Sequence, residues 1–223
     1  MSRLRLIALL SLSIVFLAGA AFGLTLNFSN LENASLTFYG SNDSFIFQPE
    51  GTNDFKITSV DGGMGETVGL GGSISGTFHI GTITQIGYVE TAPVTGAGEL
   101  KIIDKLGAAL TADLEWINIM TVFGIGGINS EGLANLSNFE YSGANPDLLA
   151  FNGTGVIISS FQFASTNGST KGLTYLTTDA RENSTSYSGS ITPSAPVPEP
   201  ATLFLMGTGL IGFGAFIRKK FKK

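Results

Sequence analysis

The sequence predicts an all-β protein: an antiparallel two-sheet sandwich, jelly-roll-like or immunoglobulin-like, with an N-terminal signal helix and one C-terminal transmembrane helix. Three observations predict it. Short segments rich in β-branched and aromatic residues recur along residues 24–191, separated by clusters of Gly, Asn, Asp and Ser. No stretch between them has a convincing helical periodicity. Each end of the chain carries an apolar run beside basic residues.

The predicted strands alternate between a buried face and a wet face. In residues 73–80, for example, Ile74, Phe78 and Ile80 point to one side of the strand and His79 to the other. Several such strands are typical of two sheets packed face to face, and about 170 residues bury a substantial core without disulfides. The chain has no cysteine. The expected strands are residues 35–40, 43–48, 55–60, 73–80, 98–104, 110–123, 136–143 and 154–165.

Residues 1–23 have the form of a secretory signal peptide. Arg3 and Arg5 precede an apolar run that ends in small residues. Cleavage after Ala20 and cleavage after Gly23 both satisfy the small-residue rule, so both remain open. The alternative for this segment is a buried N-terminal helix or an uncleaved anchor.

The other end of the chain has three parts. Residues 192–200 form a Pro-rich spacer that can hold neither a helix nor a central strand. Residues 201–217 carry no charge and, at about 1.5 Å per residue, span roughly 25 Å as a transmembrane helix. A basic tail, residues 218–223, favours the cytoplasmic side, so residues 24–191 are expected outside the inner membrane. The stop-transfer residues are Arg218, Lys219, Lys220, Lys222 and Lys223.

The run Val197-Pro198-Glu199-Pro200, followed by the apolar segment and the basic tail, resembles the PEP-CTERM sorting signal of Gram-negative bacteria. The same tail also carries the label ice-binding protein C-terminal domain, which assigns no activity to the rest of the chain. The resemblance implies that exosortase, a multi-pass membrane enzyme, recognises Pro198, Glu199 and Pro200 and processes the protein. It also implies a route through an inner-membrane intermediate to the cell surface or the extracellular matrix.

Residues 24–191, the exported body, are acidic and rich in Asn, Ser and Thr. Five basic residues against 16 acidic ones give a formal charge of −11. We expect no binding to nucleic acid, because neutralising phosphates requires a clustered basic surface. A polar, hydrated surface suits extracellular polysaccharide as a partner. Composition also explains the Asn-x-Ser/Thr triplets, with glycosylation as the alternative; they begin at Asn27, Asn33, Asn42, Asn135, Asn152, Asn167 and Asn183.

Few patterns in the body indicate catalysis, and we expect a non-catalytic surface or matrix protein without a metal or cofactor. The single histidine, His79, lies on the polar face of a strand, and the chain has no Gly-x-Ser-x-Gly motif to expose a nucleophile. Asp113 and Glu115 have the spacing of a carboxylate pair, but side chains at i and i+2 of a strand normally share a solvated face.

The alternative function is a carbohydrate-binding or calcium-binding β-sandwich module. The run Asp61 to Glu66 offers oxygen ligands for calcium but lacks the EF-hand pattern, which favours a glycine-rich turn. Trp116 could stack on a sugar ring, yet its place on one face with Leu114 and Met120 favours core packing. The other aromatic candidates for sugar stacking are Tyr39, Tyr88, Tyr141, Tyr175 and Tyr187.

Overall fold

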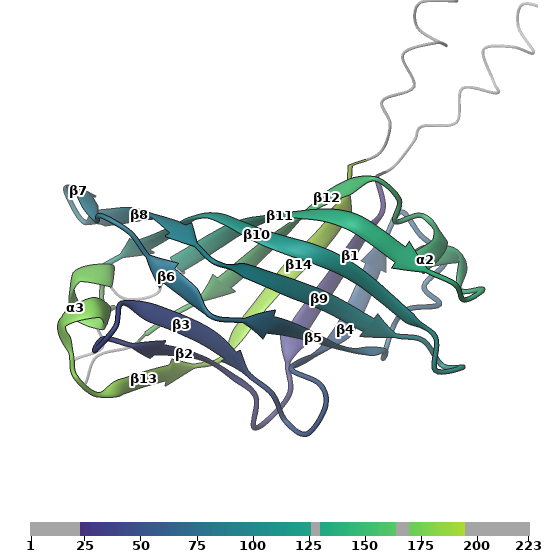
Figure 1. Cartoon of the computed structure of the whole chain (residues 1–223), viewed down its shortest axis with the longest axis horizontal. Helices are drawn as coiled ribbons and strands as arrows, with labels where there is room; N and C mark the ends of the chain where they lie inside the picture. The colour runs from purple at the N-terminus through teal and green to yellow at the C-terminus, as the bar shows by residue number, and fades with distance from the viewer. Residues whose placement is uncertain (1–22, 126–129, 164–169, 195–223) are drawn as a thin grey trace, which may run out of the picture.

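The computed structural model describes residues 23–125, 130–163 and 170–194, which form an antiparallel sheet system with two short helices (Figure 1). The strands are β1 (Thr25–Asn30), β2 (Ser35–Tyr39), β3 (Ser44–Gln48), β4 (Phe55–Asp61), β5 (Gly71–Gly76), β6 (Phe78–Ile80), β7 (Thr84–Ile86), β8 (Val89–Thr95), β9 (Ala97–Ile103), β10 (Ala109–Val122), β11 (Ser130–Tyr141), β12 (Thr154–Phe161), β13 (Glu182–Thr185) and β14 (Tyr187–Pro193). The helices are α2 (Pro146–Leu149) and α3 (Leu173–Thr178).

Eight strands close into a barrel. Their order is β11-β12-β14-β1-β4-β5-β9-β10, and β10 pairs again with β11. The predicted two-sheet sandwich is therefore wrong. Alternation reports which face of a strand is buried, and the interior of a barrel requires the same alternation as the interior of a sandwich. What separates the two folds is the set of strand neighbours, which alternation does not contain.

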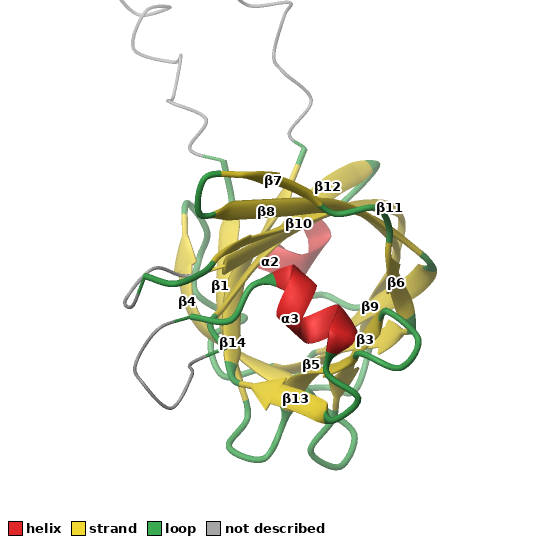
Figure 2. Cartoon of the chain, turned by 90° about the vertical axis from the view of Figure 1, so that its left-hand side faces the viewer, coloured by secondary structure: helices red, strands yellow, loops and turns green. Residues whose placement is uncertain are grey.

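The long strand β10 belongs to the barrel and to a second arm of the sheet. Its first half pairs with β9, and its second half pairs with β8, where Asn118 lies opposite Pro93. From β8 the arm continues through β6, β3, β2 and β13. The short strand β7 pairs with β8 on the edge opposite β10. Figure 2 looks along the molecule from this end and shows α3 lying across the mouth of the barrel.

Two glycines allow the sheet to bend where this arm leaves the barrel. Gly76 (φ 130°) is the last residue of β5, just before β6, and Gly96 (φ 122°) separates β8 from β9. A Cβ at Gly96 would lie 2.5 Å from the carbonyl oxygen of Thr77, the residue between β5 and β6. A side chain is therefore excluded at this position by both the backbone conformation and the close approach.

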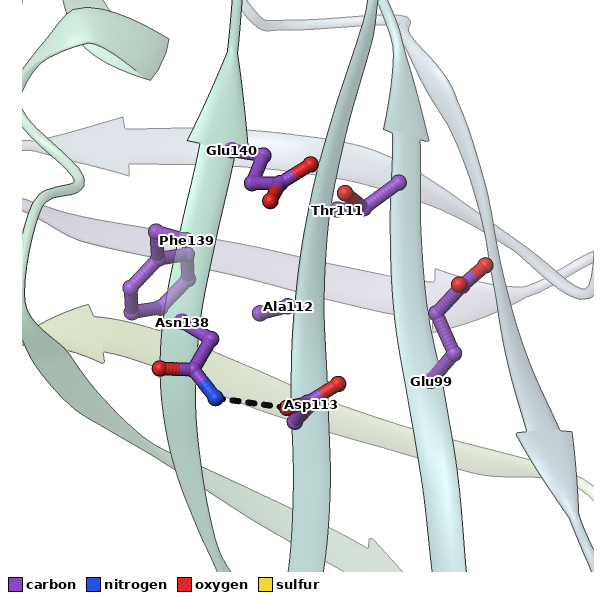
Figure 3. Close-up of a pocket in the computed structure, with 7 residues that line it drawn as sticks. All are labelled: Glu99, Thr111, Ala112, Asp113, Asn138, Phe139 and Glu140. Atoms are coloured by element: carbon purple, nitrogen blue, oxygen red, sulfur yellow. Dashed lines mark hydrogen bonds between the residues drawn. The ribbon is translucent and has the colours of Figure 1, made fainter.

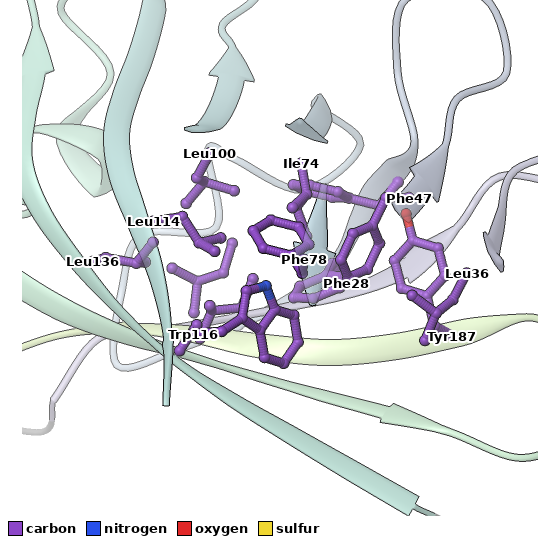
Figure 4. Close-up of a cluster of buried hydrophobic side chains, with 14 of the residues drawn as sticks. Phe28, Leu36, Phe47, Ile74, Phe78, Leu100, Leu114, Trp116, Leu136 and Tyr187 are labelled. Atoms are coloured by element: carbon purple, nitrogen blue, oxygen red, sulfur yellow. The ribbon is translucent and has the colours of Figure 1, made fainter. Parts of the chain in front are cut away.

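Aromatic side chains from the barrel strands and from the arm form a shared core (Figure 4). Phe45 and Phe78 are fully buried with ring centroids 5.3 Å apart, and Phe47 stacks on Trp116 at 6.2 Å. Burial of each such ring stabilises the fold by about 1.5–3 kcal/mol. The core position predicted for Trp116 is confirmed. A register shift between Trp116 and Asn118 turns Ile119 inward, so Met120, which was predicted on the same face, is only half-buried.

Each predicted strand segment overlaps a strand, and residues 73–80 divide into β5 and β6. Strands β1, β7, β8, β13 and β14 were not predicted. Neither helix of the described residues is long and apolar enough to cross a membrane. The predicted signal segment and the predicted transmembrane segment, residues 201–217, lie outside the described residues, so the predicted combination of a sandwich with a transmembrane helix is not supported.

Candidate functional site

The chain enters and leaves the barrel at one place. Strands β1 and β14 are antiparallel neighbours, with Leu26 opposite Ile191. Beyond this pair, the hydroxyl oxygens of Thr25 and Thr192 lie 3.3 Å apart. The predicted signal segment and the predicted C-terminal sorting segment are therefore attached to the same end of the body, which we call the exit end.

A loop between β4 and β5 packs beside the exit end. Asp147 of α2 is buried, and its carboxylate accepts hydrogen bonds from the backbone N–H groups of Met64 (2.6 Å) and Thr67 (3.3 Å). The loop also lies against the first described residues, because a Cβ at Gly63 would meet Cδ1 of Leu24 at 2.6 Å. One buried carboxylate thus holds a loop of nine residues, 62–70, at the exit end.

The calcium-binding candidate, the run Asp61 to Glu66, begins at the last residue of β4 and continues into this loop, where it forms the glycine-rich turn that the sequence favoured. Asp61 accepts a hydrogen bond from the amide of Asn27 (2.8 Å), and Glu66 forms an ion pair with Lys105 (3.6 Å). Its two carboxylates thus have separate partners. In the described ranges, no group of three or more His, Cys, Asp or Glu side chains is placed to hold a metal ion.

A second polar network fixes the hairpin between β9 and β10 at the exit end. The Tyr141 hydroxyl donates to Oδ2 of Asp104 (2.7 Å), and Oδ1 accepts from the N–H groups of Leu106 and Ala108. The Tyr141 hydrogen bond is the main cause that lowers the pKa of Asp104, and the backbone donors add to it. Tyr141, a candidate for sugar stacking, is therefore used to order this hairpin.

The outer face of β9, β10 and β11 carries a shallow hollow of about 440 Å³ (Figure 3). Asp113 and Glu115 are both exposed on this face, as alternation predicted. Asp113 accepts a hydrogen bond from the amide of Asn138 (2.7 Å), a residue with φ 51° at a register shift in the sheet. The residues that line the hollow are Glu99, Thr111, Ala112, Asp113, Asn138, Phe139 and Glu140.

Sequence reasoning missed the two other carboxylates of this hollow. Glu99 lies directly opposite Asp113, and Glu140 lies opposite Thr111. Alternation could place each glutamate on an outer face, but only the strand register brings them together. The hollow can accept hydrogen bonds from hydroxyl or ammonium groups.

The remaining predicted residues do not come together. His79 is exposed on β6, opposite Ser44 and Thr95, as expected for the polar face of a strand. Among the aromatic candidates, Tyr187 is buried, whereas Tyr88, which packs against Phe123, and Tyr175 of α3 are exposed. Neither His79 nor these tyrosines line the hollow on β9, β10 and β11, which we call the carboxylate hollow.

One glycosylation candidate is also used by the fold. The side chain of Asn183 is buried, and its carbonyl oxygen accepts a hydrogen bond from Nζ of Lys171 (2.8 Å). Asn167 lies outside the described residues.

The described body is β-rich, and its last described residue, Ser194, lies just before the predicted sorting segment. The PEP-CTERM protein-sorting motif matches residues 196–219, which confirms the predicted signal. The motif implies processing by exosortase, export, and sorting to the cell surface. The match contains Val197, Pro198, Glu199 and Pro200, which lie outside the described residues. Neither the curated proteins nor the solved structures contain a match to the chain.

Proposed function

We propose that the protein is a non-catalytic component of the cell surface or of the extracellular matrix. The observation that carries this proposal is the sorting motif at residues 196–219, which begins two residues after the last described residue, Ser194. A closed barrel joined to such a motif suits a body that is delivered to the surface as a folded unit.

The use of the buried polar groups supports a structural role. Asp54 accepts the N–H of Ile74, and Asp147 and Glu90 each hold backbone N–H groups of a neighbouring loop or helix. These buried carboxylates therefore order the chain.

The proposed route passes through an inner-membrane intermediate with the barrel outside and residues 218–223 on the cytoplasmic side. Exosortase then processes the chain near Pro198, Glu199 and Pro200. Prolines on both sides of Glu199 disfavour a helix and a central strand, which suits a segment whose backbone an enzyme must reach.

A second candidate function is binding of extracellular polysaccharide in the carboxylate hollow. Glu99, Asp113, Asn138 and Glu140 offer several hydrogen-bond acceptors to sugar hydroxyl groups on one exposed face. If this is the function, Glu99→Gln with Asp113→Asn weakens retention of the protein on cell-derived polysaccharide. Equal retention of the variant and the native protein would exclude the hollow.

Intact mass spectrometry of the protein from separate cell fractions tests the sorting proposal. The native chain is compared with a variant in which alanine replaces Pro198, Glu199 and Pro200. A spacer variant that exchanges two neighbouring residues before the motif, Ser194→Ala with Ala195→Ser, is the matched control. We expect the native and control proteins to lose both ends, and the motif variant to keep residues 201–223 in the membrane fraction. Retention of residues 201–223 in all three proteins would exclude processing at the motif.

A further inference from the structure

Two strongly exposed apolar side chains lie on loops of the exit end. Met64 is 78% exposed and Leu106 is 87% exposed. They line one hollow of about 430 Å³ together with Ala144 and Pro146, and the ion pair between Lys105 and Glu66 lies beside them. We call this surface the exit patch.

Hydrogen bonds hold the two loops of the exit patch in place, although their apolar side chains face solvent. Asp147 holds the backbone of Met64, and Asp104 holds the backbone of Leu106 at 2.8 Å. Asn145 connects the two loops. Its side-chain amide donates a hydrogen bond to the carbonyl of Glu66 (3.2 Å), and its backbone N–H donates one to the Tyr141 hydroxyl (2.9 Å). Exposed apolar side chains on ordered loops do not stabilise the free protein, so they indicate a contact surface.

The position of the sorting motif identifies what the exit patch meets. Only three residues separate Ser194 from Pro198. At about 3.3–3.6 Å per residue, Pro198 cannot lie more than roughly 15 Å from Ser194. Exosortase is a membrane enzyme, so the exit end must lie close to the bilayer when the motif is processed.

The exit patch lies near that point. Thr25 is opposite Asp61 and beside Thr192, and the loop that carries Met64 begins directly after Asp61. The hairpin tip formed by Ile86 and Tyr88 is also apolar and exposed, but it follows β7, which lies at the other end of the long axis from α2 (Figure 1).

We propose that the exit patch inserts into the lipid–water interface of the bilayer and orients the barrel while the motif is processed. The inference rests on the proposed exosortase step. Met64 and Leu106 enter the boundary between headgroups and acyl chains, where apolar side chains leave water. Lys105 and Glu66 remain at headgroup level, since their charges are solvated there.

Single-cysteine labelling of the full chain tests this contact, because the chain has no native cysteine. A bimane label is placed at Met64→Cys, at Leu106→Cys and, as the control at the opposite end, at Ile86→Cys. The labelled proteins are reconstituted into phosphatidylcholine vesicles that contain nitroxide-labelled lipid. We expect lipid quenching at positions 64 and 106 to exceed that at position 86 by at least about twofold.

Equal quenching at all three positions, or none at 64 and 106, would overturn the proposal. Shielding of positions 64 and 106 only after exosortase is added would also overturn it, because the patch would then meet the enzyme and not lipid.

A processing assay separates this inference from the proposed function. The double variant Met64→Ser/Leu106→Ser keeps the motif, and we expect its processing in cells to slow severalfold, whereas Ile86→Ser leaves the rate unchanged. If the native chain is not processed but positions 64 and 106 are still quenched by lipid, the proposed function fails and the exit patch stands. If processing is normal in the double variant and lipid quenching is absent, the exit patch alone fails.

Discussion

The carboxylate of Glu90 binds the start of helix α3 through Thr174. One oxygen accepts the Thr174 N–H (3.0 Å) and the other accepts the Thr174 hydroxyl (2.7 Å). The N-cap residue, Gly172, has no side chain for this task, and the hydroxyl of Thr121 accepts the N–H of Leu173 (3.0 Å). Glu90 and Thr121 face each other on β8 and β10, so the sheet itself caps the helix that covers the barrel mouth.

Glu90→Ala is expected to reduce the free energy of unfolding by about 1–3 kcal/mol, because it removes the acceptor from the buried end of a helix. Glu90→Gln should lose less, since its amide oxygen can still accept one hydrogen bond. Urea denaturation gives the values, with the exposed Glu131→Ala as the control. Equal stability of the Glu90→Ala and Glu131→Ala proteins would show that Glu90 does not support α3.

Gly132→Ala should destabilise the barrel by disturbing Trp116. A Cβ at position 132 would lie 2.2 Å from Cζ3 of the indole, and this ring is packed in the core. Overpacking of this kind destabilises by about 1–3 kcal/mol. Trp116 is the single tryptophan, so its fluorescence should shift to the red in Gly132→Ala and stay unchanged in Asn135→Ala, an exposed site on the same strand. An unshifted spectrum with native stability would contradict this packing.

The buried carboxyl of Asp54 should make stability depend on pH. Burial raises its pKa to about 6, and the hydrogen bond from the Ile74 N–H opposes this increase. The folded state therefore binds the proton more tightly than the unfolded state. This contribution is complete below the ordinary pKa near 3.8 and is lost as the pH rises through about 6.

Asp54→Asn removes this titration while keeping an oxygen for the Ile74 N–H. Relative to the native protein, the variant should gain about 2 kcal/mol of unfolding free energy between pH 4 and pH 7, since one pKa unit corresponds to roughly 1.4 kcal/mol. Denaturation curves at several pH values measure the gain, with the exposed Asp113→Asn as the control. A difference that does not change with pH would rule out a titrating Asp54.

Asp147→Ala should free the loop of residues 62–70, because the N–H groups of Met64 and Thr67 lose their buried acceptor. Hydrogen exchange at these two amides should become at least about tenfold faster, which corresponds to about 1.4 kcal/mol. Lys56→Ala, at an exposed position of β4, should leave them unchanged. Native protection in Asp147→Ala would mean that other contacts hold the loop.

The sequence predicted the strands whose alternation is strong and missed those whose residues are mostly polar. Ile74 and Phe78 point inward and His79 points outward because each choice depends only on neighbouring residues. Strand β14, by contrast, contains Ser, Gly, Thr and Pro, and it is a strand because β1 and β12 pair with it on both sides. The β1 partner is more than 150 positions away in the chain.

The same limit applies to the candidate sites. Asp113 and Glu115 could be assigned to a solvated face from their spacing, but the hollow that joins Asp113 to Glu99 and Glu140 required the register of three strands. The exit patch likewise combines Met64 and Leu106, which are far apart in sequence and which meet only because two buried carboxylates hold their loops.

By itself, the sequence determined the sorting signal, the acidic body and the buried face of most strands. Each of these features depends on residues that are close together along the chain, as in the motif at residues 196–219. Only the tertiary structure decided that the sheet closes, that Thr25 and Thr192 lie together at one end and that Glu90 caps α3. These features depend on the pairing of distant strands, which is chosen by the burial of the whole core and the satisfaction of all backbone hydrogen bonds together.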